Sequence, residues 1–426
     1  MSTPLSVGLI GSYLPIYRKP VEQQSLGGSE SALLYMSQAL ARRGHAVDVI
    51  ANCPDPGRYR EVNYYNMDEA SSVISQSAWD LCIVARSYAD LTLKSRSRQR
   101  WLWMHDMPAG EGSLRKLAGA LWQTTQCVTV SPFHTQVYQD AIPELADMFW
   151  TSSNGVDLKS IRKAIKGVPK KKKRIIYAAR PERGLYFLLA NVLPAMREQD
   201  PEIELVICGY DASSFKPAQQ MQAYYDQLNK LIAETPGVID YGPLSKTEYW
   251  KLLASSKLMT YPTNFPEVFC INAAEAMACG TPIITTFNFA LPHVVPYHDQ
   301  MIPGNPDTEE YTTRFANVAC GLMRDDVSYA RLKREGERYV EERFQWAMVA
   351  DAWEARANHI FDARREAKAP WIIDQLVWNS DLIAAREMAL KEVPQKLEAI
   401  NTLISSHAAT HEDSDSYVQG ADTAQS

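Results

Sequence analysis

Two glutamates eight positions apart, Glu267 and Glu275, stand in the stretch PEVFCINAAEAMACGTP, which begins at residue 266. On a helix, eight residues turn through about 800°, so both carboxylates would share one side, roughly 12 Å apart. Such a spacing would span a nucleotide sugar from its ribose to its hexose. The expected helix starts near Phe269 and ends at Gly280. Glu267 would therefore lie just before the first turn and Glu275 inside the helix.

Two arginines supply the positive charge that a diphosphate between ribose and sugar would need. The unpaired N–H groups at a helix N-terminus attract anions, but the helix dipole contributes only about 0.3–1 kcal/mol, or about 2 kcal/mol when partly buried. Arg180 and Arg183 follow an apolar run at 175–179, where a strand would end. Because guanidinium groups grip phosphate oxygens in pairs, both side chains are expected to reinforce the helix N-terminus.

The elements that must position these residues follow a repeated strand–helix–strand order. Residues 5–11 predict a buried strand, 31–43 an amphipathic helix and 46–51 the next strand. The order restarts at 175–179, after the basic run 170–174, which we interpret as a solvated linker. The predicted class is α/β, with two Rossmann-like, doubly wound parallel sheets facing each other across a cleft.

The chain divides by composition into four predicted segments. Residues 1–165 form the first Rossmann-like domain, 166–345 the second and 346–406 a helical crossover and extension. The polar end, 407–426, is rich in Ser, Asp, Thr and Gly and predicts a disordered tail. The extension at 370–405 leaves open a contact with the first domain, an oligomer or a membrane surface.

The glutamate segment resembles the Glu-x7-Glu signature of the family-four, retaining glycosyltransferases of the GT-B fold. Four further pieces resemble motifs of that family, in the same order, so the resemblance covers roughly residues 5 to 360. They are Gly27-Gly28-Ser29-Glu30, His105-Asp106, Asn154-Gly155-Val156-Asp157, and Arg180 with Arg183-Gly184.

The resemblance implies a role for each of the charged residues. Glu275 would hold the two ribose hydroxyls, and Glu267 would contact the hydroxyls of the donor sugar. Arg180 and Arg183 would neutralise the leaving diphosphate. Each also has an ordinary explanation, such as a surface ion pair between Arg180 and Glu182 or a plain helix glutamate at position 275.

Further donor and acceptor contacts are implied at the edge of the first domain. Gly27 and Gly28 would bring backbone N–H groups against the donor's phosphates or the acceptor, or would form an ordinary strand-to-helix loop. His105 would point into the cleft and touch the donor sugar, unless it is a structural histidine. Asp106 would orient His105 or bind the acceptor. The remaining donor-binding residues implied by the resemblance are Phe269, Cys270 and Ile271.

Two positions depart from the family pattern. Cys270 stands where the family has glycine, which lets the backbone approach the donor. Arg183 replaces the usual phosphate-binding lysine, which keeps the charge. Both changes leave the identity of the donor open between UDP- and GDP-linked sugars.

The reaction implied is transfer of a hexosyl or other glycosyl unit to an acceptor hydroxyl with retention of configuration. No carboxylate is placed to act as a nucleophile, so a front-face route is expected, in which the leaving diphosphate takes the acceptor's proton. No Asp-x-Asp motif occurs before the polar tail, so neither a metal nor another cofactor is expected. The catalytic set would be His105, Glu267, Arg180 and Arg183.

Global properties limit the partners. The net charge of −6 argues against a dedicated nucleic-acid binder. The seven cysteines lack zinc-ligand spacing, and no run of eighteen apolar residues occurs, so we expect a cytoplasmic protein with reduced thiols, attachment to a membrane surface remaining open. The acceptor is left open among glycan, lipid-linked and nucleic-acid molecules, including a modified DNA base of the phage type. An epimerase, a phosphorylase or an inactive binding module could also use the same two-domain plan.

Overall fold

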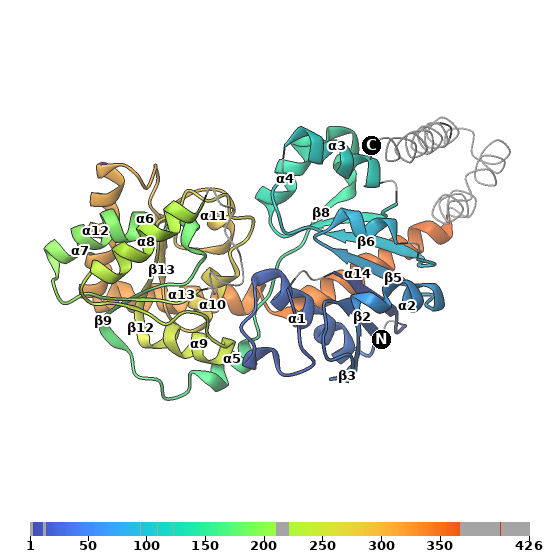
Figure 1. The fold of residues 1–426 in the computed structure, drawn as a ribbon, viewed down its shortest axis with the longest axis horizontal. Coiled ribbons are helices and arrows are strands. Elements are labelled where there is room, and N and C mark those ends of the chain that lie inside the picture. Colours follow the sequence, from blue (N-terminus) through green and yellow to red (C-terminus); the bar gives the residue numbers. More distant parts are fainter. Residues whose placement is uncertain are drawn as a thin grey trace, which may run out of the picture.

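A computed structural model shows two lobes side by side, joined by two passages of the chain (Figure 1). It describes residues 3–11, 14–93, 95–108, 110–121, 123–209, 221–366 and 401. The expected extension at 370–405 and the tail at 407–426 therefore lie outside the described residues, apart from position 401. No helix among the described residues is long and apolar enough to cross a membrane.

The N-terminal lobe is built on an eight-stranded sheet in the order β3-β4-β2-β1-β5-β6-β7-β8. All its neighbouring strands pair in parallel except β3, which runs antiparallel to β4 at one edge. The central strands are buried on both faces, as parallel sheets usually are. The strands are β1 (Ser6–Ile10), β2 (Ala46–Ala51), β3 (Gly57–Tyr59), β4 (Val62–Asn66), β5 (Leu81–Ala85), β6 (Gln99–Trp103), β7 (Gln126–Thr129) and β8 (Phe149–Thr151).

Helices cover both faces of this sheet, and the first of them begins at the glycine motif. Helix α1 starts at Gly28, with Gly27 as its N-cap, so the second glycine belongs to the helix rather than to a loop. The helices of the N-terminal lobe are α1 (Gly28–Arg42), α2 (Ala70–Gln76), α3 (Glu111–Leu121) and α4 (Pro132–Ala141).

The C-terminal lobe contains a five-stranded, fully parallel sheet in the order β11-β10-β9-β12-β13. Its strands are β9 (Lys171–Tyr177), β10 (Glu204–Ile207), β11 (Val238–Asp240), β12 (Ser256–Tyr261) and β13 (Ile283–Thr285). The helices of this lobe are α5 (Leu158–Ala164), α6 (Leu185–Phe187), α7 (Leu193–Gln199), α8 (Gln222–Glu234), α9 (Lys246–Ser255), α10 (Ile271–Ala278), α11 (Leu291–Val294), α12 (Glu309–Arg324) and α13 (Asp326–Arg343).

The basic run at 170–174 is part of the sheet and not a solvated linker, so that prediction was wrong. Lys170 Nζ donates to the Ser256 and Gly280 carbonyls, at 2.8 and 3.2 Å. Arg174 is buried and forms two hydrogen bonds with Glu204, at 3.1 and 3.2 Å. These cations hold neighbouring elements of the lobe together.

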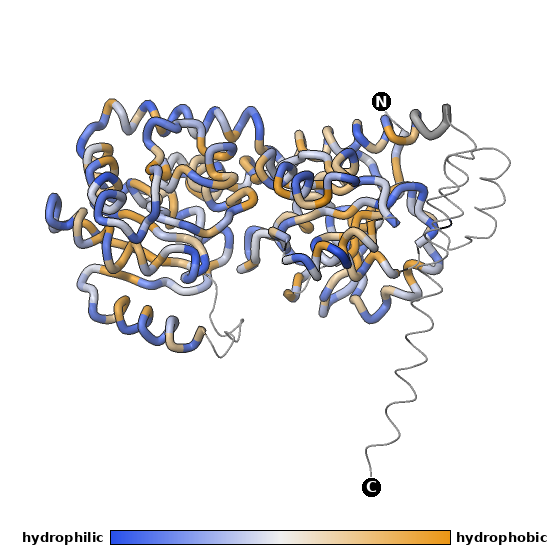
Figure 2. The backbone as a smooth tube through the Cα atoms, turned by 90° about the horizontal axis from the view of Figure 1, so that it is seen from above, coloured by the Kyte–Doolittle hydropathy of each residue, from blue (hydrophilic) through white to orange (hydrophobic). Residues whose placement is uncertain are grey.

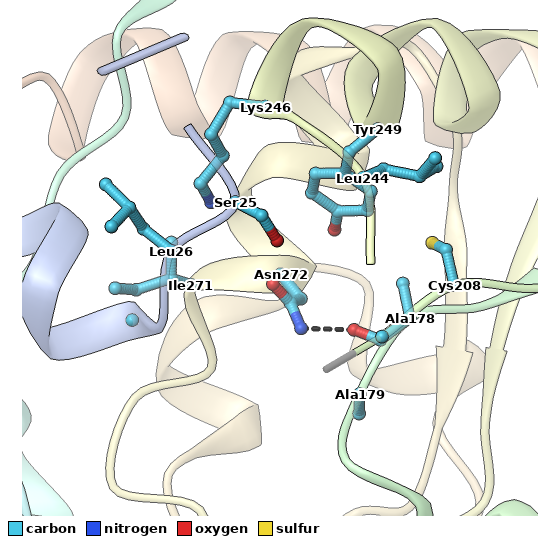
Figure 3. A pocket seen from close by; sticks show the side chains of 12 residues that line it. Ser25, Leu26, Ala178, Ala179, Cys208, Leu244, Lys246, Tyr249, Ile271 and Asn272 are labelled. Carbon is cyan, nitrogen blue, oxygen red and sulfur yellow. Dashed lines mark hydrogen bonds between the residues drawn. The ribbon is translucent and has the colours of Figure 1, made fainter. Parts of the chain in front are cut away.

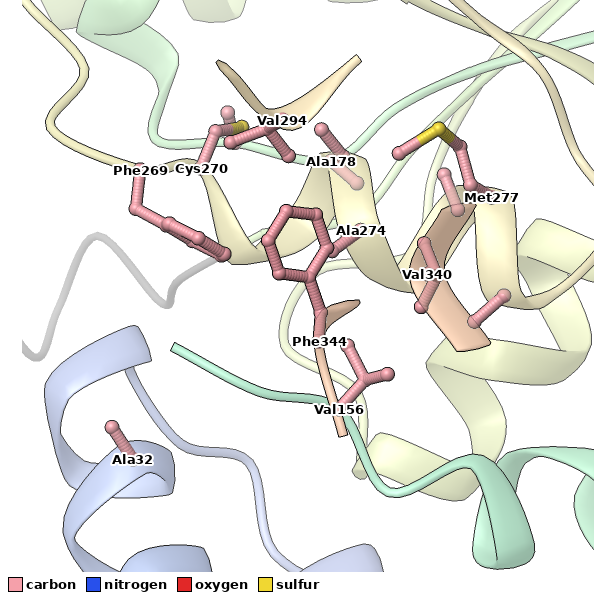
Figure 4. Close-up of a cluster of buried hydrophobic side chains, with 14 of the residues drawn as sticks. Ala32, Val156, Ala178, Phe269, Cys270, Ala274, Met277, Val294, Val340 and Phe344 are labelled. Carbon is pink, nitrogen blue, oxygen red and sulfur yellow. The ribbon is translucent and has the colours of Figure 1, made fainter. Parts of the chain in front are cut away.

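Hydrophobic stretches, orange in Figure 2, run through the inside of both lobes. One buried cluster continues from lobe to lobe, and Figure 4 shows the part of it around α10. The rings of Phe269 and Phe344 meet edge to face there, with centroids 5.1 Å apart. Apolar packing therefore fixes the start of α10 against the second passage between the lobes.

The two passages between the lobes run next to each other. The first is Asn154–Asp157, which lies ahead of the boundary predicted at 165, because the following helix α5 packs against α9. The second contains Phe344, whose carbonyl accepts the Val156 N–H at 2.6 Å. Gly155 is needed at this crossing, since a Cβ there would stand 2.8 Å from the backbone nitrogen of Trp346.

After this crossing, α14 (Trp346–Glu366) returns to the N-terminal lobe and packs on α1. Buried Glu354 on α14 accepts from Arg43 Nε at 2.6 Å and lies 3.4 Å from His45 Nε2. The Gln99 side chain donates to the Ala357 carbonyl at 2.7 Å. Helix α14 thus belongs to the N-terminal lobe, across which it runs in Figure 1.

Gly155→Ala is expected to lower the free energy of unfolding by about 1–3 kcal/mol, the usual cost of forcing extra volume into a packed site. Urea unfolding measures the effect. Gly119→Ala, on α3 with nothing within 4 Å of the added carbon, is the control and should gain about 0.5–1 kcal/mol. Equal stability of the two variants would show that the crossing is not tightly packed.

Candidate functional site

A cleft of about 380 Å³ opens between the carboxyl ends of the two sheets, where α/β folds bind ligands. Almost all of the predicted catalytic and donor residues line it. Its walls are Leu14, Gly28, Ser29, Glu30, Arg86, His105, Asp106 and Asn154 from the N-terminal lobe, and Ala179, Arg180, Arg183 and residues 267–272 from the C-terminal lobe.

Glu267 and Arg183 form a fixed pair on the C-terminal wall. The Glu267 Oε1 atom accepts from Arg183 Nη1 at 3.0 Å and from the Tyr261 hydroxyl at 2.6 Å. Arg183 also lies over the Phe265 ring, 4.1 Å from its centroid. Glycine must follow Arg183, since a Cβ on Gly184 would meet the Pro262 carbonyl at 2.0 Å. The pair is therefore held in a defined orientation at the edge of the cleft.

Arg180 lines the cleft and also forms the ion pair with Glu182 that was the ordinary explanation of this arginine. Its Nε lies 2.7 Å from Glu182 Oε1, and the arginine side chain is about one-third exposed, 31%. Glu182 in turn accepts from the Tyr225 hydroxyl at 2.8 Å. An anion in the cleft would thus meet a guanidinium group that Glu182 already orients.

Cys270 is the N-cap of α10 and has left-handed backbone angles, φ 71° and ψ 75°. The helix therefore begins at Ile271, one turn after Glu267 rather than directly after it. In this conformation a residue with a side chain costs roughly 1–2 kcal/mol, which glycine avoids. The turn directs the first N–H groups of α10 toward the cleft, where they form a potential anion site.

Replacing Cys270 by Gly and by Ala separates backbone strain from the loss of the thiol. The Gly variant should be more stable than the Ala variant by up to about 1 kcal/mol, after subtracting the greater freedom of glycine in the unfolded chain. At Cys279, where φ is −82°, the same two substitutions should rank in the opposite order. Chemical denaturation of all four variants measures this. A higher stability of Cys270→Ala than of Cys270→Gly would contradict the proposed backbone strain.

His105 stands on the opposite wall, two residues after β6. Its ring packs on Trp103, with centroids 4.6 Å apart. Neither ring nitrogen has a hydrogen-bond partner among the described residues, and the same is true of Asn154 Oδ1 nearby in the cleft. Burial lowers the pKa of His105 to about 3, so the imidazole is neutral near pH 7. It can exchange hydrogen bonds with a ligand without adding charge.

Asp106 extends this wall and pairs with Arg86. The guanidinium donates to both carboxylate oxygens, at 2.9 and 3.0 Å. Burial alone would raise the pKa of Asp106, but the hydrogen bonds and charge of Arg86 outweigh it and lower the pKa. The backbone carbonyl of Asp106 accepts from His134 Nε2 and from the Tyr138 hydroxyl, both at 3.0 Å. His134 is thus buried and structural.

A smaller pocket of about 70 Å³ continues from the cleft along the start of α10. Figure 3 shows its walls, with Ser25 and Leu26 contributed by the N-terminal lobe and Tyr249 pointing its hydroxyl into the space. That hydroxyl is buried without a hydrogen-bond partner among the described residues, and burial raises its pKa, so it stays protonated. Asn272 donates to the Ala178 carbonyl at the pocket floor.

Glu275 does not line either space, although its predicted role places it against a ribose. It is buried, and its two carboxylate oxygens lie 2.9 and 2.8 Å from Lys246 Nζ. The Trp250 indole N–H donates to Oε1 at 3.0 Å. Lys246, which sequence reasoning did not select, lines the pocket and stands between Glu275 and the space. A ribose contact of Glu275 stays a prediction that would have to share the carboxylate with Lys246.

Because Glu275 pairs with Lys246, a Glu275 variant tests the stability of the protein as well as its function. Glu275→Ala leaves the Lys246 charge buried and should destabilise the protein by about 3–5 kcal/mol. Adding Lys246→Met removes that charge and should recover part of the loss, which a double-mutant cycle in urea measures. Lys246→Met alone is the matched control and should also destabilise. Small, additive effects would show that the pair contributes little.

The glycine motif brings the lobes into contact. Gly28 lines both spaces, and a Cβ on it would lie 3.5 Å from the Ile271 side chain. Nearby, the Lys246 N–H donates to the Gln24 carbonyl at 3.1 Å. Gly27 caps α1, and its carbonyl accepts the Ser31 hydroxyl at 2.7 Å. The motif therefore closes one end of the cleft over the start of α10.

Several contacts were beyond reach of sequence reasoning. Lys246 and Tyr249 have the pattern of ordinary residues of an amphipathic helix, and only the fold brings them opposite Asn272. Asn154 belongs to the Asn-Gly-Val-Asp motif, for which no role was predicted. Its buried amide oxygen has no hydrogen-bond partner among the described residues, which indicates a role in contacting a ligand in the cleft. No group of three or more His, Cys, Asp and Glu side chains suited to a metal ion occurs among the described residues.

The overall arrangement matches known structures. The chain superposes on the Anabaena protein Alr3699/HepE in complex with UDP-glucose with a TM-score of 0.62 and 16% identity, covering 84% of this chain and 100% of that one. The fold is GT-B. Residues 159–317, which form most of the C-terminal lobe, match the family described as Glycosyl transferases group 1.

Two mannosyltransferases are similar in sequence. The chain is 26% identical over 204 residues to phosphatidyl-myo-inositol mannosyltransferase of Mycobacterium tuberculosis, covering 46% of this chain and 50% of the relative. It is 32% identical over 176 residues to the MMP alpha-(1->4)-mannosyltransferase of Mycolicibacterium hassiacum, covering 40% and 38%. These matches span half the length of the relatives or less.

Proposed function

We propose that the protein is a retaining glycosyltransferase that moves a sugar from a nucleoside diphosphate to an acceptor hydroxyl without a metal ion. The observation that carries the proposal is the meeting of Arg180, Arg183 and the start of α10 on one wall of the cleft. Two guanidinium groups and a helix N-terminus form a seat for a diphosphate. The group 1 match covers the same lobe.

The two connected spaces give the donor a direction. Its base enters the pocket of Figure 3, where the Tyr249 hydroxyl can donate to it. Its diphosphate lies at the start of α10, and its sugar reaches toward Glu267 and His105 in the larger cleft. The smaller space favours uracil over the larger guanine, so we propose a UDP-linked sugar. The donor named in the matched Anabaena structure is of this class.

In the proposed front-face reaction, the bond between the anomeric carbon and the diphosphate oxygen breaks as the acceptor oxygen bonds to that carbon. The acceptor's proton passes to the departing diphosphate. Arg180, Arg183 and the α10 N–H groups stabilise the charge that develops there, and their fixed orientation lowers the cost of reorganisation. Glu267 and the neutral imidazole of His105 position the sugar by hydrogen bonds to its hydroxyls.

Arg180→Ala should lower kcat/KM for sugar transfer or donor hydrolysis roughly 10²–10³-fold, the usual cost of removing one group that stabilises developing charge. Arg331→Ala is the control, because Arg331 also pairs with a glutamate, at 3.4 Å, but lies on α13 outside the cleft. Circular dichroism should show both variants folded.

The donor for this assay is selected by the rise in Tm that UDP and GDP produce in the parent protein. UDP should raise the Tm more than GDP, because ligand binding to the folded state stabilises it. Near-parental turnover of Arg180→Ala at saturating donor would contradict the assignment. If neither nucleotide shifts the Tm, the proposed function fails.

A further inference from the structure

A separate cavity of about 160 Å³ lies in the N-terminal lobe, next to the cleft. It shares Arg86, His105 and Asp106 with the cleft, so the two spaces meet at these residues. Neither the sequence motifs nor the proposed donor accounts for it. Most of its other walls are apolar, from Tyr88, Leu102, Met104, Met107, Pro108, Leu114, Leu117 and Tyr138, with Ser113 adding a hydroxyl.

The inner walls of this ring cavity, as we call the space, offer an occupant little hydrogen bonding. Leu102, Met104 and Leu117 are buried and belong to the hydrophobic cluster on this face of the sheet. The hydroxyl of Tyr138 is already used, because it donates to the Asp106 carbonyl at 3.0 Å. Its ring stacks on Phe149, with centroids 5.5 Å apart. A polar occupant would therefore leave its own groups without partners.

Size and lining together favour one planar ring. An engineered apolar cavity of about 150 Å³ in another protein binds benzene, so a space of 160 Å³ suits an occupant of that size. Methionine sulfur makes favourable contacts with aromatic rings, and Met104 and Met107 both line the cavity. Tyr88 and Tyr138 add aromatic surface.

The polar end of the cavity is where a reacting hydroxyl would lie. Arg86, which has a left-handed φ of 66°, is tied to Asp106 by two hydrogen bonds. His105, whose ring nitrogens have no hydrogen-bond partner among the described residues, lines both this end of the cavity and the cleft in which the donor sugar is proposed to lie. An acceptor held by a ring in the cavity would thus present its hydroxyl to the sugar.

We infer that the acceptor is an alcohol or phenol whose hydroxyl is carried on, or one carbon from, a benzene-sized aromatic ring that fills this cavity. The inference rests on the proposed function. Its oxygen bonds to the anomeric carbon, the bond to the diphosphate breaks with its electron pair leaving on the diphosphate, and the hydroxyl proton goes to that leaving group. No further reactant is required.

Benzyl alcohol, hexan-1-ol and ethanol are compared as acceptors with the full chain and the donor selected by thermal shift. Benzyl alcohol should exceed both others at least tenfold in kcat/KM. Leu114→Trp fills the cavity from its half-buried wall and should remove at least nine-tenths of that advantage. Lys116→Trp, exposed on the same helix and outside the cavity, should leave it unchanged.

Saturation-transfer NMR with benzyl alcohol and no donor tests the cavity independently of transfer. Binding to the parent protein and to Lys116→Trp, but not to a folded Leu114→Trp, is expected. If UDP fails to bind but this pattern holds, the proposed function fails, while the ring cavity remains supported as a binding site for an aromatic alcohol. Equal use of hexan-1-ol, or binding that Leu114→Trp does not reduce, overturns the inference, including when donor turnover is normal.

Discussion

The arrangement of the site depends on the left-handed turn at Cys270. On one side of the turn, Phe269 is fixed in the core against Phe344, and on the other side the buried alanines of α10 fill the interior of the lobe. The backbone between them has to reverse sharply, and so the N–H groups of α10 face the cleft. Arg183, Arg180 and the glycine motif are arranged around this one point. Backbone strain at Cys270 accompanies the placing of a helix N-terminus at the edge of the cleft.

Charge around the cleft is balanced mostly by pairs within the protein. Glu267 holds Arg183, Glu182 holds Arg180, and Arg86 holds Asp106. Pairing fixes the direction of each guanidinium group and lowers the entropy that a ligand must remove on binding. His105 is neutral among these charges because burial lowers its pKa. The site therefore combines fixed cationic groups on the C-terminal wall with an uncharged imidazole, beside the Arg86–Asp106 pair, on the N-terminal wall.

The buried parallel strands were predictable because continuous apolar runs mark them. Strands β3 and β4 were missed, since they lie at the sheet edge and carry polar residues. The turn at Cys270 could not be foreseen, because a non-glycine residue gives no local signal for a left-handed conformation. The Lys246–Glu275 pair joins residues 29 positions apart, and only the tertiary fold reveals it. Local patterns thus identified the elements and the cleft residues, while long-range contacts decided how the charges are used.

Docking of α14 on the N-terminal lobe has a mechanical consequence. The two passages between the lobes lie side by side at Gly155 and Trp346, so any opening of the cleft has to bend both at a single axis. Arg43 and Glu354 bind α14 to the N-terminal lobe, and the helix turns with that lobe. A tether attached after Glu366 would thus hold the N-terminal lobe still and leave the C-terminal lobe to swing. Immobilising the protein by that end would not by itself prevent the cleft from opening and closing.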